Sequence, residues 1–101
     1  MIAFHLEYTL DPELVDDFQI YAGSFVELTR KYGGEHFGYF VNVGKERTTA
    51  VAIFAFPDVT DYDLYRKQVL FDPQYERAMK LARSTRCIKN CYRTVYGRQV
   101  A

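Results

Sequence analysis

The chain has 101 residues, a length typical of one compact domain spanning residues 1–101. Hydrophobic residues make up 49% of it and charged residues 26%, which excludes the compositions of disordered and fibrous chains. Its 13 basic and 13 acidic side chains cancel, so the chain as a whole has no net field that would attract nucleic acid or an anionic membrane.

The sequence predicts no membrane segment and no metal site. Its longest apolar run, residues 50–56, has seven residues, whereas about 20 are needed to cross a bilayer. The N-terminus has no basic segment before an apolar stretch, so we expect a cytoplasmic protein. Cys87 and Cys91 fall on one predicted strand about 13 Å apart, too far for a disulfide. His5 and His36 are isolated, so we expect neither a metal nor a cofactor.

Residues 2–9 alternate between apolar and polar side chains, which predicts a first strand. Asp11-Pro12 predicts a helix start, because Asp caps the N-terminus and Pro needs no amide partner in the first turn. Gly33-Gly34 predicts its end, because glycine adopts the left-handed conformation of a C-cap. Between them, apolar side chains follow one helical stripe: Leu14, Phe18, Tyr21, Phe25 and Leu28.

Residues 35–43 and 48–56 predict a hairpin, with a turn at residues 44–47 and Pro57 ending the second strand. A second helix is expected to begin with Thr60 and Asp63 as a capping box. Its expected buried stripe is Tyr62, Tyr65 and Val69.

Asp72-Pro73 predicts a break in that helix, because Pro disfavours the helical conformation in the preceding residue. We expect the helix to restart there and to bury Tyr75, Met79 and Ala82. Residues 86–96, rich in β-branched and aromatic side chains, predict the last strand. The order βαββαβ predicts an α+β, ferredoxin-like fold, with a four-stranded antiparallel sheet and two helices on one face.

The third predicted strand is apolar on both faces. Val51, Ile53 and Ala55 point to one side, and residues 50, 52, 54 and 56 point to the other. Helices can cover only one face of the sheet. The simplest cover for the other face is a second copy of the chain, so we expect a homodimer.

Four short motifs lie along the chain in a specific order. They are Tyr8-Thr9-Leu10 with Pro12, Gly38-Tyr39-Phe40 with Gly44, Ile53-Phe54-Ala55-Phe56, and Tyr65-Arg66 followed by Asp72-Pro73 and Tyr75. Over nearly the whole chain this order resembles the NIPSNAP family, a branch of the dimeric α+β barrel superfamily. The resemblance implies two ferredoxin-like protomers packed sheet against sheet, with a ligand between the sheet and the helices of each protomer.

The resemblance has one departure in the first strand. Many NIPSNAP sequences look like Glu-x-Arg-x-Tyr there, and this chain has Phe4, Leu6 and Tyr8 at those positions. Two polar candidates for the pocket are therefore missing. The family has no single agreed reaction, so the resemblance implies no particular catalysis.

His36 and Tyr39 are the candidate catalytic residues, because an imidazole titrates near neutrality and a nearby phenol could donate to a developing oxyanion. Their spacing of three would place them on opposite faces of a strand, unless a bulge at Gly38 turns one of them. The candidate ligand-binding residues are Tyr8, Tyr62, Tyr65 and Arg66. An aromatic wall with one guanidinium would suit aromatic or medium-chain carboxylates.

Three functions fit these observations. The first is a homodimeric small-molecule-binding domain of the NIPSNAP type. The alternatives are a cofactor-independent monooxygenase or isomerase of the dimeric α+β barrel type, and a non-catalytic protein-interaction module. RNA recognition motifs share this element order, but their aromatic platform is replaced here by Thr49, Ala50, Val51 and Ile53, so no nucleic-acid partner is expected.

Overall fold

The computed structural model describes residues 1–44 and 46–101 and has the expected order of elements. These are β1 (Ile2–Leu10), the 3₁₀-helix η1 (Pro12–Leu14), α1 (Val15–Lys31), β2 (Glu35–Val43), β3 (Thr48–Phe56), α2 (Val59–Val69), α3 (Pro73–Thr85) and β4 (Ile88–Tyr96). Lys45, part of the predicted turn, lies outside the described residues.

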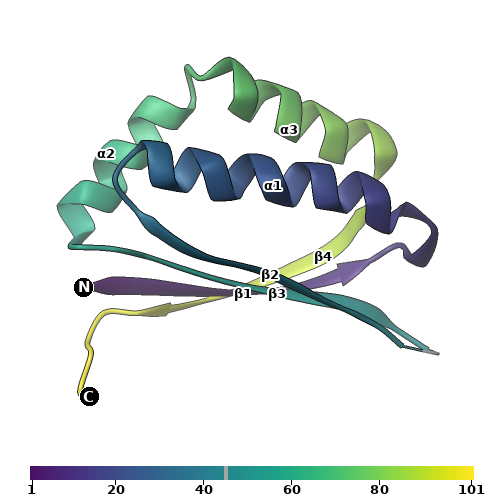
Figure 1. Cartoon of the computed structure of the whole chain (residues 1–101), viewed down its shortest axis with the longest axis horizontal. Coiled ribbons are helices and arrows are strands. Elements are labelled where there is room, and N and C mark those ends of the chain that lie inside the picture. The colour runs from purple at the N-terminus through teal and green to yellow at the C-terminus, as the bar shows by residue number, and fades with distance from the viewer. Residues whose placement is uncertain (45) are drawn as a thin grey trace.

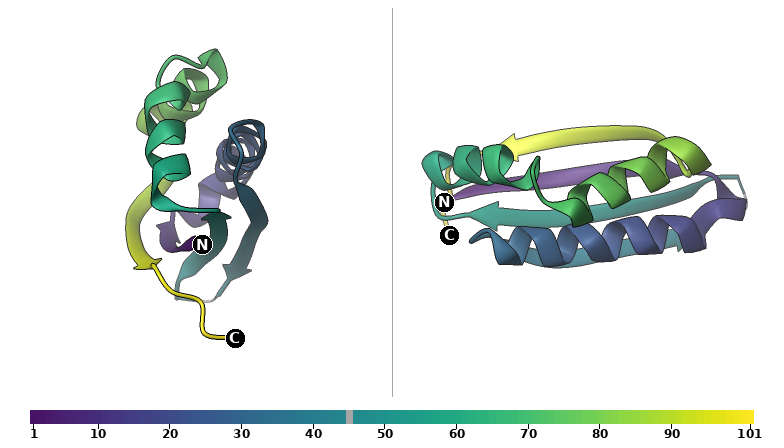
Figure 2. Two further views of the ribbon diagram at one scale, coloured as in Figure 1. Left: turned by 90° about the vertical axis from the view of Figure 1, so that its left-hand side faces the viewer. Right: turned by 90° about the horizontal axis from the view of Figure 1, so that it is seen from above.

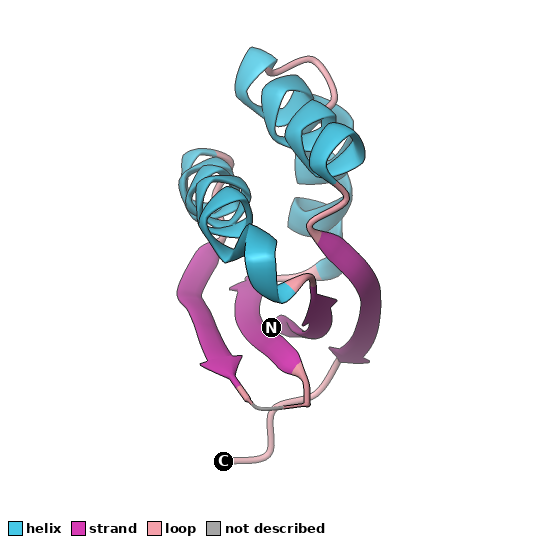
Figure 3. Cartoon of the chain, turned by 90° about the vertical axis from the view of Figure 1, so that its right-hand side faces the viewer, coloured by secondary structure: helices cyan, strands magenta, loops and turns pink. Residues whose placement is uncertain are grey.

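The four strands form one antiparallel sheet in the order β2-β3-β1-β4, which confirms the predicted ferredoxin-like fold. All three α-helices lie over the same face of the sheet, and no helix formed by the described residues covers the opposite face (Figure 1). The end-on view shows α1 on one side of this layer and α2 with α3 on the other (Figure 3). No helix among the described residues is long and apolar enough to cross a membrane.

The two glycines after α1 serve different purposes. Gly33 has φ 93°, the left-handed conformation expected of the residue that ends a helix. Gly34 allows a close approach, because a Cβ atom there would lie 2.7 Å from ring atom Cζ of Phe56. Asp11 is a helix cap, as expected, but it caps the short η1 that precedes α1. Its side chain accepts a hydrogen bond from Glu13 N at 3.0 Å.

The predicted cap of α2 is wrong by two residues. Asp58 is the N-cap, and its Oδ1 accepts a hydrogen bond from Asp61 N at 3.0 Å. Asp58 still has an extended backbone (φ −151°, ψ 178°), so its carboxylate can reach an amide of the first turn, whereas Thr60 already lies inside the helix. The predicted break at Asp72-Pro73 is confirmed, since α2 ends at Val69 and α3 begins at Pro73.

The buried residue of α3 differs from the expectation. Ala78 is 3% exposed, whereas Tyr75, Met79 and Ala82 are only partly buried. The reason is that α3 packs beside α1 and not directly on the sheet, as the end-on view on the left of Figure 2 shows. A small side chain suits such a close contact between helices. The last strand also begins later than expected, because Arg86 takes up a left-handed C-cap with φ 58°.

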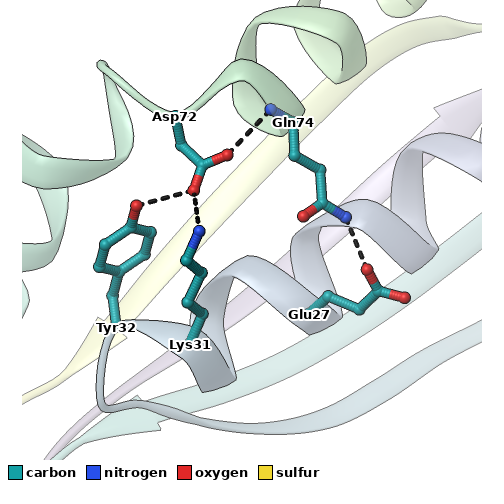
Figure 4. Close-up of polar contacts among 5 residues, drawn as sticks. All are labelled: Glu27, Lys31, Tyr32, Asp72 and Gln74. Carbon is teal, nitrogen blue, oxygen red and sulfur yellow. Dashed lines mark hydrogen bonds and ion pairs between the residues drawn. The ribbon is translucent and has the colours of Figure 1, made fainter.

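Asp72 joins the two parts of the helical layer (Figure 4). Its Oδ2 accepts hydrogen bonds from Lys31 Nζ and Tyr32 OH, both at 2.7 Å, and its Oδ1 accepts one from Gln74 N at 2.9 Å. These donors lower the pKa of the Asp72 carboxyl to about 2, the bond from Lys31 having the largest effect. The network holds the end of α1 against the junction of α2 and α3, and so fixes the separation of the helices above the sheet.

Candidate functional site

A cavity of about 170 Å³ lies between the helical layer and the sheet. Its walls are mainly aromatic and come from both layers: Leu6, Tyr8, Tyr21, Phe25, Thr29, His36, Tyr39, Phe54, Tyr62, Tyr65 and Arg93. Three of the four predicted ligand-binding residues and both predicted catalytic residues therefore line one cavity. Their functional roles stay predictions.

A bulge in β2 brings His36 and Tyr39 to the same face. His36 pairs with Phe54 and Tyr39 with Ala52, so three steps along β2 match two along β3. Gly38, inside this bulge, has φ 98°. The two rings stack with centroids 5.0 Å apart, and the other neighbour of the His36 ring is Phe54 at 5.6 Å.

His36 is a neutral histidine, contrary to the expectation that it titrates near neutrality. Burial, with a smaller effect of the Arg30 guanidinium, lowers its pKa to about 4. Gly38 N donates a 2.9 Å hydrogen bond to Nδ1, so the proton of the neutral ring is on Nε2. Arg30 Nη2 in turn donates to the His36 carbonyl oxygen at 3.1 Å and helps to hold the bulge.

Four tyrosines of the cavity, Tyr8, Tyr21, Tyr39 and Tyr65, stay protonated at neutral pH. Burial raises the pKa of Tyr21 and of Tyr65 to about 12. The pKa values of Tyr8 and Tyr39 are also raised well above the usual range, first by burial and then by neighbouring phenols. The hydroxyls can therefore donate or accept hydrogen bonds, but they supply no negative charge.

The cation of the cavity is Arg93 and not Arg66. Arg93 lies opposite Leu6 in the β1–β4 register, its Nη1 donates to Tyr62 OH at 3.1 Å, and its Cζ lies 5.8 Å from the Phe4 ring centroid. Arg66 does not line the cavity. It follows Tyr65, which is the buried residue of that turn, so it lies about 100° further round α2. Its Cζ contacts the Tyr62 ring at 5.8 Å, and its side chain is exposed.

Sequence reasoning missed Arg93 because its position depends on strand pairing. Alternation alone shows that Arg93 shares a face with Cys91 and Val95. That this face is the one beneath the helices follows only from the pairing of Arg93 with Leu6 and of Val95 with Phe4. A predicted register for the last strand would have identified it.

The sheet face without helices carries large exposed apolar side chains, including Phe40, Ile53, Tyr92 and Tyr96. His5 and Glu7 also lie here, with Nδ1 of His5 3.8 Å from Oε1 of Glu7. This is the face predicted to pack against a second copy. Among residues 1–44 and 46–101, no group of three or more His, Cys, Asp or Glu side chains lies together as metal ligands would.

The fold is that of a ferredoxin-like α+β domain with a cavity between the helices and the sheet. A family model described as NIPSNAP matches residues 6–98, so the chain belongs to the NIPSNAP family. No curated protein matches the chain.

Solved structures share this fold at low sequence identity. Protein Atu4242 from Agrobacterium tumefaciens has a TM-score of 0.78 and 19% identity, with 98% of this chain and 94% of that chain covered. An uncharacterized NIPSNAP domain protein from Burkholderia xenovorans has a TM-score of 0.74 and 14% identity, with 98% of this chain and 95% of that chain covered. A proposed antibiotic biosynthesis monooxygenase from Deinococcus radiodurans has a TM-score of 0.70 and 14% identity, with 100% of this chain and 95% of that chain covered.

Proposed function

We propose that the chain is a homodimeric small-molecule-binding domain whose ligand occupies the cavity between helices and sheet. The observation that carries this proposal is the composition of the cavity wall: aromatic rings, one guanidinium and no carboxylate. Such a wall attracts a planar ligand that carries a negative group, because the rings can stack on it, the guanidinium attracts its charge and no carboxylate repels it.

The size of the cavity limits the ligand. A protein cavity of about 150 Å³ accepts benzene, and this one measures about 170 Å³. The proposed ligand class is therefore a single-ring aromatic carboxylate. Arg93 at the rim would hold the carboxylate, and Tyr8, Tyr62 and Tyr65 would contact the ring.

Thermal unfolding in the presence of benzoate tests the proposal. A ligand that binds only the folded chain adds about 2.7 kcal/mol at 100 times its Kd, so the Tm should rise with benzoate concentration. Glucose, which has neither an aromatic ring nor a negative charge, and AMP, which is too large for the cavity, are the controls. If no aromatic carboxylate raises the Tm, the proposed ligand class is wrong, and a non-catalytic protein-interaction module becomes the better alternative.

The uncovered sheet face supports the homodimer. Tyr92 is 69% exposed and Ile53 40% exposed in the single chain, an unfavourable arrangement for a lone protomer. A second copy related by a two-fold axis would bury both side chains from each protomer. A cytoplasmic location stays a prediction, which cell fractionation would test.

A second candidate is a cofactor-independent monooxygenase or isomerase. It is favoured by the likeness of the whole chain to the Deinococcus radiodurans structure and by the phenols around the cavity. A monooxygenase of this kind would convert an activated CH₂ group to a carbonyl with dioxygen and release water. Oxygen uptake with a single-ring substrate that carries an activated CH₂ group, such as phenylpyruvate, compared between the wild type and the Tyr39→Phe variant, tests this activity.

A further inference from the structure

The cavity contains one buried hydrogen-bond donor that the protein leaves unsatisfied. His36 is 5% exposed, and its Nε2 has no acceptor among the described residues. Leaving a buried donor unpaired costs about 1–3 kcal/mol, so native structures rarely keep one without a reason.

The position of this donor is fixed from the other side of the ring. Nδ1 faces the backbone, where it accepts the hydrogen bond from Gly38 N at 2.9 Å. The flat faces of the ring pack against Tyr39 and Phe54 at 5.0 and 5.6 Å. These contacts restrict rotation of the ring. Because Nδ1 is held by the backbone, Nε2 is the nitrogen left for a ligand in the cavity that His36 lines.

We infer that His36 Nε2–H donates a hydrogen bond to an uncharged oxygen of the ligand, and so selects single-ring carboxylates that carry a hydroxyl or carbonyl group. The inference rests on the proposed function and refines its ligand class. Arg93 is the partner for charge, and His36 is the partner for a neutral acceptor. Benzoate has only the charged carboxylate, whereas a hydroxybenzoate has both a carboxylate and an uncharged hydroxyl oxygen.

Two variants distinguish the roles of the two ring nitrogens of His36, Nδ1 as acceptor from the backbone and Nε2 as donor to the ligand. In His36→Asn, the side-chain oxygen can still accept from Gly38 N, but the donor into the cavity is lost. In His36→Gln, the longer amide keeps a donor near the position of Nε2. In the wild-type protein, at least one of 2-, 3- and 4-hydroxybenzoate should bind about five-fold more tightly than benzoate, the worth of one net hydrogen bond. His36→Asn should lose this preference and still bind benzoate, and His36→Gln should keep most of it.

Nitrogen NMR of histidine-labelled wild-type protein gives a readout that does not depend on variants. The chain has two histidines, so the spectrum is simple to assign with His5→Gln as the reference. The preferred hydroxybenzoate should shift the Nε2 resonance of His36 and leave the ring neutral, whereas benzoate should shift it much less.

The outcomes distinguish this inference from the proposed function. If benzoate binds but every hydroxybenzoate binds equally and His36 does not shift, the inference is overturned and the proposed function stands. If His36→Asn retains the preference for hydroxybenzoate over benzoate, another group donates the hydrogen bond to the uncharged oxygen and the inference is again overturned. If none of these carboxylates binds, both are overturned.

Discussion

The rings of His36 and Tyr39 stack with centroids 5.0 Å apart, although three positions separate them on one strand. In a regular strand, residues three apart point to opposite faces of the sheet. The contact therefore depends on the extra residue of the bulge, where Gly38 has φ 98°. Both side chains line the cavity for this reason.

Gly38→Ala should lower the free energy of unfolding by about 1–2 kcal/mol, because an L-residue is strained in the left-handed region. No neighbouring atom lies within 4 Å of the added Cβ, so strain and not a clash is the cause. Urea unfolding measures the change. Gly23→Ala is the matched control, since Gly23 is exposed within α1 with open space around it. It should raise stability by about 0.5–1 kcal/mol. A neutral Gly38→Ala would show that the bulge does not require glycine.

Arg93→Leu should weaken benzoate binding at least ten-fold, because a charge-assisted hydrogen bond contributes about 1.5–3 kcal/mol. Arg66→Leu should leave binding unchanged, since Arg66 lies outside the cavity. Titration calorimetry of both variants makes the comparison. A larger loss of benzoate affinity in Arg66→Leu than in Arg93→Leu would show that Arg66, as predicted from the sequence, is the residue that binds the carboxylate.

Asp72→Asn should destabilise the chain near neutral pH and much less at low pH. The folded-state pKa is lowered from 3.8 to about 2, so the ionised carboxylate stabilises the fold. This contribution is fully present above about pH 4 and is lost as the pH falls through about 2. Unfolding curves between pH 2 and 7 should show the wild type and the variant converging at the acid end. Asp63→Asn, an exposed change on α2, is the control. A difference that stays constant with pH would contradict the role of the Asp72 charge.

Ile53→Asp should prevent the proposed homodimer and leave the protomer folded, because Ile53 lies on the uncovered sheet face. Phe54→Asp should unfold the protomer, since its ring stacks on Phe4 at 4.7 Å and packs beside His36. Sedimentation and circular dichroism distinguish the two results. A wild-type chain that is monomeric at micromolar concentration would refute the homodimer.

Local patterns predicted the elements well because each depends on nearby residues. Alternation predicted the strands, and Asp72-Pro73 predicted the break between α2 and α3, because proline restricts its own neighbour. The sequence also suggested that a bulge at Gly38 could turn either His36 or Tyr39, but it could not show that the bulge forms. That depends on the pairing of β2 with β3.

The errors have a common physical cause. Arg93 was missed, and Arg66 was chosen instead, because helical spacing is visible in sequence whereas the register between β1 and β4 is not. Tyr75, Met79 and Ala82 were expected to be the buried residues of the restarted helix, but α3 packs beside α1 and buries Ala78. Contacts between elements distant in the chain decided both cases.

The bulge in β2 has a second consequence, for association through the strand edges. β2 is an edge strand, and a regular nine-residue edge would offer an unbroken row of amide and carbonyl groups as a template for further strands. A bulge interrupts that row and increases the local twist. A β2 without its extra residue would turn His36 out of the cavity and would also leave an edge prone to aggregation.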